Sequence, residues 1–153
     1  MLWLQRHAAM TEPQLNEALD QKSGLYALAG VADMREVLSG VTAGVARSRL
    51  AFDVYIHRLR SCIATTAAAM NGLDALVFTG GVGENAPAVR AAAVSGLEFL
   101  GLDIDAGLNA NVEVDADISV VDAAVRTLVV HAREDVEVAR EVRRVLSEND
   151  GRA

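Results

Sequence analysis

The fold is decided by the stretch ALVFTGGVGEN, residues 75–85. Its first half, Ala75–Thr79, is short and apolar, with the branched and aromatic side chains that strands favour. Its second half, Gly80–Asn85, is rich in glycine and predicts a turn. Pro87 follows, and proline is favoured in the first turn of a helix because its missing N–H is not needed there. We therefore expect a strand, a turn and a helix that runs to about Leu100.

Outward from this stretch, strands and helices continue to alternate along the chain. Two more β-prone runs occupy Ile118–Val121 and Thr127–Val130, and the helical segments are Leu15–Gln21, Met34–Leu38, Val45–Met70 and Glu134–Ser147. This alternation is typical of an α/β fold with a mainly parallel sheet. Three strands are few for so many helices, so we expect the sheet to be incomplete in this chain.

The composition indicates a folded, acidic chain. Hydrophobic residues make up 52% of the 153 residues and aromatic residues only 4%, so the core is expected to consist mostly of Ala, Val, Leu and Ile. Lys and Arg total 14 against 21 Asp and Glu, a net charge of −7. Because the basic residues are scattered, we do not expect binding to nucleic acid or to an anionic membrane surface. The length favours one domain, residues 1–153.

The cysteine and hydropathy patterns favour the cytoplasm. Cys62 is the only cysteine, which excludes an intrachain disulfide, and a lone cysteine in an apolar helix is usually a small buried hydrophobe. We expect this of Cys62. No apolar run reaches the roughly 18–20 residues of a membrane span, and no charged leader precedes an apolar stretch at the N-terminus.

The glycine-rich turn at 80–85 is the strongest candidate binding site. Glycine lets a ligand approach the backbone closely, and the turn follows a predicted parallel strand, whose carboxyl end is where ligands bind in open α/β sheets. The next helix would add unpaired N–H groups and the positive end of its dipole, which attract phosphate. A glycine turn that only joins strand to helix explains the same residues, and the turn alone does not decide between the two.

Two known phosphate-binding patterns can be compared with this turn. No Lys-Ser or Lys-Thr follows the glycines, which excludes a Walker A loop. Gly81–Ala86 does fit the relaxed dinucleotide pattern, with Asp103 or Asp105 as the acid expected about 20 residues on. Against this, the region around Ile104 is not a clear second strand, and Glu84 would direct negative charge at a pyrophosphate. A Rossmann-type NAD-binding domain therefore stays an alternative only.

Two further segments could bind a ligand. In Asp33-Met34-Arg35, the guanidinium plane of Arg35 could cover an adenine face, although a helix N-cap and an ion pair explain these residues as well. Glu134-Asp135 follow the last predicted strand, where a carboxylate could bind Mg²⁺ directly or through water. Acidic residues in a first helical turn also favour the helix dipole, so the residues alone leave both alternatives open.

Taken together, these segments resemble the acetate kinase (acetokinase) family. The resemblance covers nearly the whole chain, in matching order and spacing, and Val77–Asn85 is its most specific stretch. The matching segments are Lys22–Leu25, Asp33–Arg35, Leu73–Asn85, Gly96–Gly101 and Glu134-Asp135.

The resemblance implies the C-terminal nucleotide-binding and dimerisation domain of an actin-like, sugar-kinase-like (ribonuclease H-like) ATPase fold. The family's activity is reversible phosphoryl transfer from ATP to acetate, which gives acetyl phosphate and ADP. Carried over to this chain, Asp33, Met34 and Arg35 would border the adenosine, and Glu134 would help bind Mg²⁺. The nucleotide and its phosphates would be bordered by Gly81, Val82, Gly83, Glu84 and Asn85.

The resemblance also implies limits. The family's acyl pocket, catalytic histidine and phosphoryl-steadying arginines belong to an N-terminal domain that has no match here, and phosphoryl transfer depends on such positioned charge. We therefore expect no catalytic residue in this chain and no use of acetate or acetyl phosphate without that domain. His7, His57 and His131 also lack the spacing of zinc ligands.

Two expectations concern the partner chain and the metal site. Because the family dimerises through its C-terminal domain, the resemblance implies a homodimer. Where the family usually has Thr-Asn-Glu-Glu, this chain has Ala132-Arg133-Glu134-Asp135, and an arginine beside a metal ligand is unexpected. The alternative function is a catalytically inactive nucleotide-binding or dimerisation module from a truncated gene.

Overall fold

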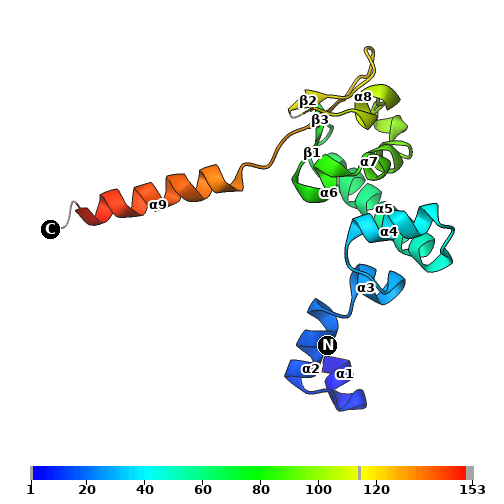
Figure 1. Ribbon diagram of the computed structural model, residues 1–153, viewed down its shortest axis with the longest axis vertical. Helices are drawn as coiled ribbons and strands as arrows, with labels where there is room; N and C mark the ends of the chain where they lie inside the picture. Colours follow the sequence, from blue (N-terminus) through cyan, green and yellow to red (C-terminus); the bar gives the residue numbers. More distant parts are fainter. Residues whose placement is uncertain (1, 114, 151–153) are drawn as a thin grey trace. The chain divides into compact units, whose positions relative to one another are not determined.

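The computed structural model describes residues 2–113 and 115–150, and the chain forms two compact units. The first unit contains the chain up to Gly72 together with Ala92–Phe99, and the second contains Leu73–Ala91 and the chain from Leu100 onward. Figure 1 labels the helices and strands of both units. That the two units act as one functional domain stays a prediction.

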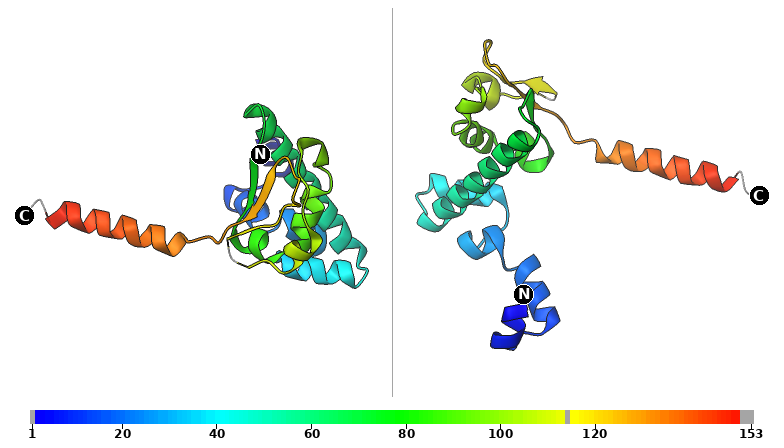
Figure 2. Two further views of the ribbon diagram at one scale, coloured as in Figure 1. Left: turned by 90° about the horizontal axis from the view of Figure 1, so that it is seen from above. Right: turned by 180° about the vertical axis from the view of Figure 1, so that it is seen from behind.

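The first unit is built on one long helix. Its helices are α1 (Leu2–Ala8), α2 (Glu12–Asp20), α3 (Gly24–Ala29), α4 (Met34–Thr42) and α5 (Ala46–Ala69). Helices α3 and α4 pack against α5, and Figure 2 shows α4 running beside α5 in both views. The buried side chains of this packing include Val37, Phe52 and Ile56. The long helix expected at 45–70 is thereby confirmed. It ends at Ala69, and Asn71 and Gly72 just beyond it have φ angles of 60° and 144°.

The expectation that Cys62 is buried is wrong, because its side chain is exposed on α5. Cys62 follows the buried Ile56 by six positions. At about 100° per residue, this places it roughly 240° further around the helix, away from the face that packs inward. Position on the helix face therefore decides the burial of this cysteine, rather than its apolar character.

The second unit contains a three-stranded sheet in the order β1-β3-β2. Its strands are β1 (Ala75–Phe78), β2 (Ala116–Asp117) and β3 (Arg126–Val129). Strands β1 and β3 are parallel, with Ala75 opposite Arg126 and Phe78 opposite Val129, whereas β2 is antiparallel to β3. The strands predicted at 75–79 and 127–130 are confirmed to within a residue.

The strand predicted at Ile118–Val121 is wrong, because β2 ends at Asp117. The carboxylate of Asp117 accepts the backbone N–H of Ser119 at 2.9 Å, which bends the chain directly after the strand. Ile118 is still fully buried and donates its N–H to the carbonyl of Thr127 at 2.9 Å. The apolar run therefore packs inward without continuing as a strand.

The turn predicted at Gly80–Asn85 is also wrong, because these residues form a short helix, α6. Two side chains of the segment close it on itself. Glu84 Oε1 accepts the N–H of Gly80 at 2.7 Å, and Asn85 Nδ2 donates to the carbonyl of Gly81 at 2.9 Å. These local bonds offset the low helix propensity of three glycines.

The helix expected to reach Leu100 ends early, at Val94, and the cause lies on α5. This helix, α7, spans Pro87–Val94. The guanidinium of Arg60 donates from Nε to the carbonyl of Ala92 at 2.9 Å and from Nη2 to Ser95 Oγ at 2.9 Å. A Cβ at Gly96 would lie 2.5 Å from the Cζ of Arg60, so a larger residue at this position would require the arginine side chain to move.

The remaining elements complete the second unit around an aliphatic core. They are the 3₁₀ helix η1 (Glu98–Leu100), which spans both units, α8 (Ala106–Ala110) and α9 (Glu134–Asp150). The buried apolar side chains include Phe78, Val89, Leu102, Ile118, Val125 and Val129. Most of these core residues are Val, Leu or Ile, as the composition predicts. Over the described ranges, no helix is both long enough and apolar enough to cross a membrane.

Candidate functional site

The site of the second unit begins where β1 ends. Phe78, the last residue of β1, accepts the N–H of Val130 through its carbonyl at 2.9 Å, so the ends of β1 and β3 are held side by side. Two residues later, Gly80 has a φ of 72°, in the left-handed region that favours glycine. This backbone angle turns the chain from the strand into α6. The short helix therefore starts at the carboxyl end of a parallel strand pair.

The two other glycines of α6 have different surroundings. A Cβ at Gly83 would lie 3.2 Å from the backbone carbonyl carbon of Phe78, so Gly83 is needed for close packing of α6 on β1. A Cβ at Gly81 would have no heavy atom within 4 Å, apart from its own chain neighbours and the backbone of its own helix, and Gly81 is exposed. The backbone at Gly81 is thus open to an incoming group, whereas Gly83 serves the fold.

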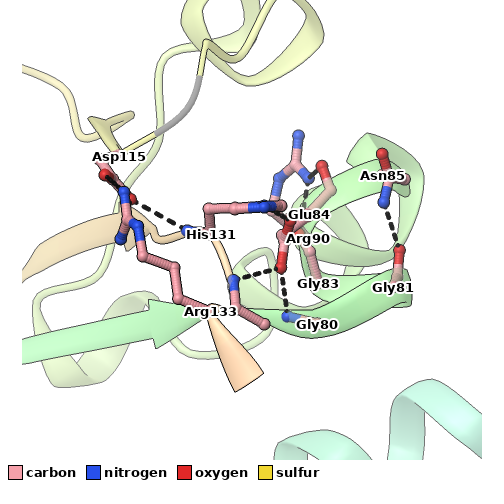
Figure 3. Close-up of polar contacts among 10 residues, drawn as sticks. Gly80, Gly81, Gly83, Glu84, Asn85, Arg90, Asp115, His131 and Arg133 are labelled. Atoms are coloured by element: carbon pink, nitrogen blue, oxygen red, sulfur yellow. Dashed lines mark hydrogen bonds and ion pairs between the residues drawn. The ribbon is translucent and has the colours of Figure 1, made fainter. Parts of the chain in front are cut away.

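The side chain of Glu84 is directed toward protein donors. Its Oε1 accepts the backbone N–H groups of Gly80 at 2.7 Å and Ala132 at 2.9 Å, and its Oε2 lies 2.6 Å from Nδ1 of His131 (Figure 3). The N–H of Ala132, the imidazole of His131 and the N–H of Gly80 lower the pKa of this carboxyl, the Ala132 bond most strongly. Glu84 is therefore an ionised carboxylate whose oxygens interact with donors of the protein itself.

Asp115 also binds the segment that contains His131 and Ala132. Its Oδ1 accepts the backbone N–H of His131 at 3.0 Å, and its carboxylate pairs with the guanidinium of Arg133 (Figure 3). The hydrogen bond from Arg133 is the main cause that lowers the pKa of Asp115. Between the two acids lies a cavity of about 260 Å³, lined by Glu84, Asn85, Val112, Glu113, Asp115, Val129 and His131.

A buried arginine donates hydrogen bonds to the end of α6. Arg90 is 1% exposed and donates from Nη1 to the carbonyls of Gly83 and Glu84, each at 2.7 Å. Its other nitrogens donate to Asn109 in α8. Burial lowers the pKa of Arg90. The backbone carbonyls at the end of α6 are thereby fixed by a charged group, which strengthens each hydrogen bond.

Asp33, Met34 and Arg35 lie in the first unit, at the start of α4. Asp33 caps the helix by accepting the N–H of Arg35 at 2.8 Å, and it also pairs with the guanidinium of Arg35. These two bonds from Arg35 lower the pKa of Asp33 to about 2. The side chain of Arg35 is 88% exposed, whereas Met34 is 5% exposed and belongs to the core.

Glu134 is exposed and is the first residue of α9. The carbonyl of the preceding Arg133 accepts the N–H of Val136 at 3.1 Å, which starts the helix. An arginine was unexpected beside the predicted metal ligand Glu134. The guanidinium of Arg133 pairs with the carboxylate of Asp115, so its positive charge has a partner. Within the described part of the chain, no group of three His, Cys, Asp or Glu side chains could hold a metal ion.

The structure brings some of the predicted site residues together. Gly81, Gly83, Glu84 and Asn85 share α6, and Glu84 contacts Ala132, two residues before Glu134. Asp33, Met34 and Arg35 belong to the other unit.

Residues His131, Asp115, Arg90 and Asn109 were not predicted. Arg90 alone had a usable signal in the sequence. It is a single charged residue within the apolar run AVRAAAV, and such a residue is often buried with hydrogen-bond partners.

Solved structures define the class of protein. The Porphyromonas gingivalis acetate kinase matches 95% of this chain and 37% of its own chain, with a TM-score of 0.84 and 31% identity. A propionate kinase from Francisella tularensis matches 92% of this chain and 36% of its own, with a TM-score of 0.82 and 32% identity. The chain therefore has the actin-like ATPase fold of these kinases, with the small incomplete sheet expected from its sequence.

Sequence comparison gives the family. The model of the acetokinase family matches residues 1–140. Acetate kinases from Rippkaea orientalis and Gloeobacter violaceus are 47% and 46% identical to this chain over 142 residues. The chain belongs to the acetokinase family. It is 92% covered by each of these two matches and spans 35% of the length of each relative.

Proposed function

We propose that this chain supplies the nucleotide- and magnesium-binding part of an ATP:acetate phosphotransferase, which interconverts ATP and acetate with ADP and acetyl phosphate. The observation that carries the proposal is the open backbone at Gly81, at the carboxyl end of a parallel strand, in a chain of the acetokinase family. Ligands of open α/β sheets bind at such strand ends.

Each unit by itself has its own proposed nucleotide contacts. At α6, the backbone of Gly81, Val82 and Gly83 and the amide of Asn85 would border the phosphates, while the carboxylate of Glu84 stays with its protein donors. At α4, the exposed guanidinium of Arg35, oriented by Asp33, would cover the adenosine. Met34 would contribute through its backbone, because its side chain is buried.

Glu134 is the proposed magnesium ligand. Mg²⁺ is usually held by one or two carboxylates together with waters and substrate phosphates. A single exposed carboxylate at the start of α9 suits this arrangement, and Mg²⁺ would neutralise charge on the phosphates that it bridges. Because Arg133 pairs with Asp115, its guanidinium would not compete with Mg²⁺ for the carboxylate of Glu134.

Acetate and acetyl phosphate are proposed as partners of the whole phosphotransferase, acting in the cytoplasm. We expect the 153-residue chain alone to bind nucleotide without turnover, and full acetate kinase activity from it would contradict this. A homodimer is proposed as well. In support, Leu50 and Val54 lie one turn apart on α5 and are 53% and 40% exposed. Apolar side chains that a dimer interface covers would be exposed in this way in the structure of a single chain.

The test is a calorimetric titration of the chain with ADP, with and without Mg²⁺, and with NAD as a control. Saturable ADP binding that Mg²⁺ strengthens is the expected result. NAD binding tighter than ADP binding would revive the dinucleotide alternative. No ADP binding to a folded chain, together with a stable dimer by light scattering, would instead favour a dimerisation module.

A matched pair of variants tests the metal ligand. Glu134→Gln is expected to abolish the Mg²⁺ enhancement and leave the Mg²⁺-free affinity for ADP unchanged. Asp135→Asn removes the neighbouring carboxylate of the same helical turn and is expected to behave like the wild type. Equal losses in both variants would show that the negative charge of α9, and not a specific ligand, matters.

A further inference from the structure

Glu84 joins the ends of two parallel strands. Gly80 follows β1 and Ala132 follows β3, and both N–H groups donate to one oxygen, Oε1, at 2.7 and 2.9 Å. The second oxygen lies 2.6 Å from Nδ1 of His131. One carboxylate therefore links the start of α6 to the segment that leads into α9, although about fifty residues separate them in the sequence.

The surroundings of Glu84 suit an internal link better than a ligand contact. Its side chain is 16% exposed, and its two oxygens already serve three donors. A carboxylate that turned toward phosphate would have to give up these bonds and would meet like charge, which is unfavourable. The low pKa of Glu84, caused mainly by the Ala132 N–H, agrees with a carboxylate held by protein donors.

The linked segment is also fixed from its other side. Asp115 accepts the N–H of His131 at 3.0 Å and pairs with Arg133. Residues 131–133 are thus held by Glu84 and Asp115 together, and Glu134 follows directly. Groups that orient a metal ligand through such bonds typically change metal affinity about 10- to 100-fold when they are removed.

We propose that Glu84 is a positioning residue that acts through Ala132 and His131, and that it couples nucleotide binding at α6 to magnesium binding at Glu134. The proposal rests on the proposed function of this site. It replaces direct contact between the Glu84 carboxylate and the nucleotide with a structural link. Magnesium and ADP then strengthen each other's binding, because both act on segments that Glu84 holds together.

Two substitutions of Glu84 distinguish the effect of its hydrogen bonds from the effect of its negative charge. In Glu84→Gln the amide oxygen can accept from Gly80 and Ala132, and the amide NH₂ can donate to Nδ1 of neutral His131. In Glu84→Ala all three bonds are lost. We expect Glu84→Ala to weaken Mg²⁺-dependent ADP binding about 10- to 100-fold and Glu84→Gln to keep most of it. Equal losses in the two variants would mean that the charge itself contacts the ligands, and would overturn the proposal.

The matched control is Glu113→Ala, which removes a carboxylate from the same cavity but belongs to neither strand end. It is expected to leave ADP binding with Mg²⁺ near the wild-type value. A loss as large as that of Glu84→Ala would assign the effect to the net charge of the cavity and would overturn the link. His131→Ala removes only the Oε2 contact and is expected to cause a smaller loss. It replaces Glu84→Ala if that variant does not fold.

Amide hydrogen exchange of the ligand-free chain gives a readout that needs no nucleotide. Glu84→Ala is expected to speed exchange at Gly80 and Ala132 together, and Glu84→Gln to leave both near the wild-type rate. If the wild-type chain binds no ADP, the proposed function fails, and this exchange still decides whether Glu84 holds the two segments. Unchanged exchange at both amides in Glu84→Ala would overturn the proposal in either case.

Discussion

Arg90 donates two hydrogen bonds to one residue, Asn109, at 2.8 Å to its side-chain oxygen and 2.7 Å to its backbone carbonyl. Asn109 in turn donates from Nδ2 to the carbonyl of Pro87 at 3.0 Å. Through this pair, α8 is bonded to the helix that follows α6, and all partners of the buried guanidinium within the described ranges are neutral oxygens. The cation is stabilised by carbonyl and amide dipoles alone, which demands good geometry.

Replacing Arg90 by methionine is expected to lower the free energy of unfolding of the second unit by about 3 kcal/mol. The apolar methionine side chain leaves the carbonyls of Gly83, Glu84 and Asn109 without their donor. Urea unfolding followed by circular dichroism measures the change. Arg140→Met removes an exposed arginine from α9 and should cost less than about 0.5 kcal/mol. Equal costs would contradict the importance of burial.

Alanine at Gly81 and at Gly83 should have opposite effects on stability. Gly83→Ala places a Cβ 3.2 Å from the backbone of Phe78, and we expect a loss of about 2 kcal/mol. Gly81→Ala meets no heavy atom within 4 Å beyond its own helix backbone and chain neighbours, and it raises helix propensity, so stability should rise by roughly 0.5 kcal/mol. If phosphates approach Gly81, the same variant should weaken ADP binding roughly tenfold, or 1.4 kcal/mol. Unchanged ADP affinity in Gly81→Ala would argue against that approach.

The contribution of Asp33 to stability should depend on pH. Its pKa is lowered to about 2 from the ordinary value of 3.8 by the bonds from Arg35. A lowered pKa stabilises the folded state above the ordinary value, and this stabilisation is lost as the pH falls through about 2. Asp33→Ala should therefore lower the urea midpoint at pH 7, and its gap to the wild type should close between about pH 4 and pH 2. A gap that stays constant over this range would disprove the assignment.

Asp53→Ala provides the matched comparison for Asp33. It breaks an exposed ion pair with Arg49 on α5 without removing a helix cap. Exposed pairs of this kind contribute little, so the urea midpoint should stay near that of the wild type across the same pH range.

Thr127→Val should stabilise the chain. Thr127 is fully buried in β3, and its hydroxyl has no hydrogen-bond partner among the described residues. Its backbone N–H donates to Ser119 Oγ at 2.6 Å, a bond that valine keeps. Removing an unpaired buried hydroxyl should raise the free energy of unfolding by about 1 kcal/mol. Thr65→Val, whose exposed hydroxyl bonds the carbonyl of Ser61, serves as the control. A lower stability of Thr127→Val would reveal a partner for the hydroxyl.

Features with local causes could be predicted from the sequence. The long helix α5 depends on periodicity, and the strands β1 and β3 depend on β propensity. The N-cap depends on Asp33, whose carboxylate accepts an N–H donated only two residues away. The aliphatic core also follows from composition. Nothing beyond neighbouring residues is needed for these assignments.

Features with distant causes could not be predicted. The early end of α7 depends on Arg60, which lies more than thirty positions from Ala92, its acceptor. Glu84 was predicted to border a nucleotide, but its partners at 131 and 132 are visible only in the folded chain. Pairs so far apart in sequence carry no local pattern, so a single sequence gives no signal for them.

The pairing of Ala75 with Arg126 has a consequence for the order of folding. Helix α5 can form from contacts within about four residues, whereas β1 and β3 must first close a loop of about fifty residues, which is slow and entropically costly. The link through Glu84 needs both strand ends in place. During refolding, helical signal should therefore return first, and the proposed binding of ADP should return last, in a slower kinetic phase.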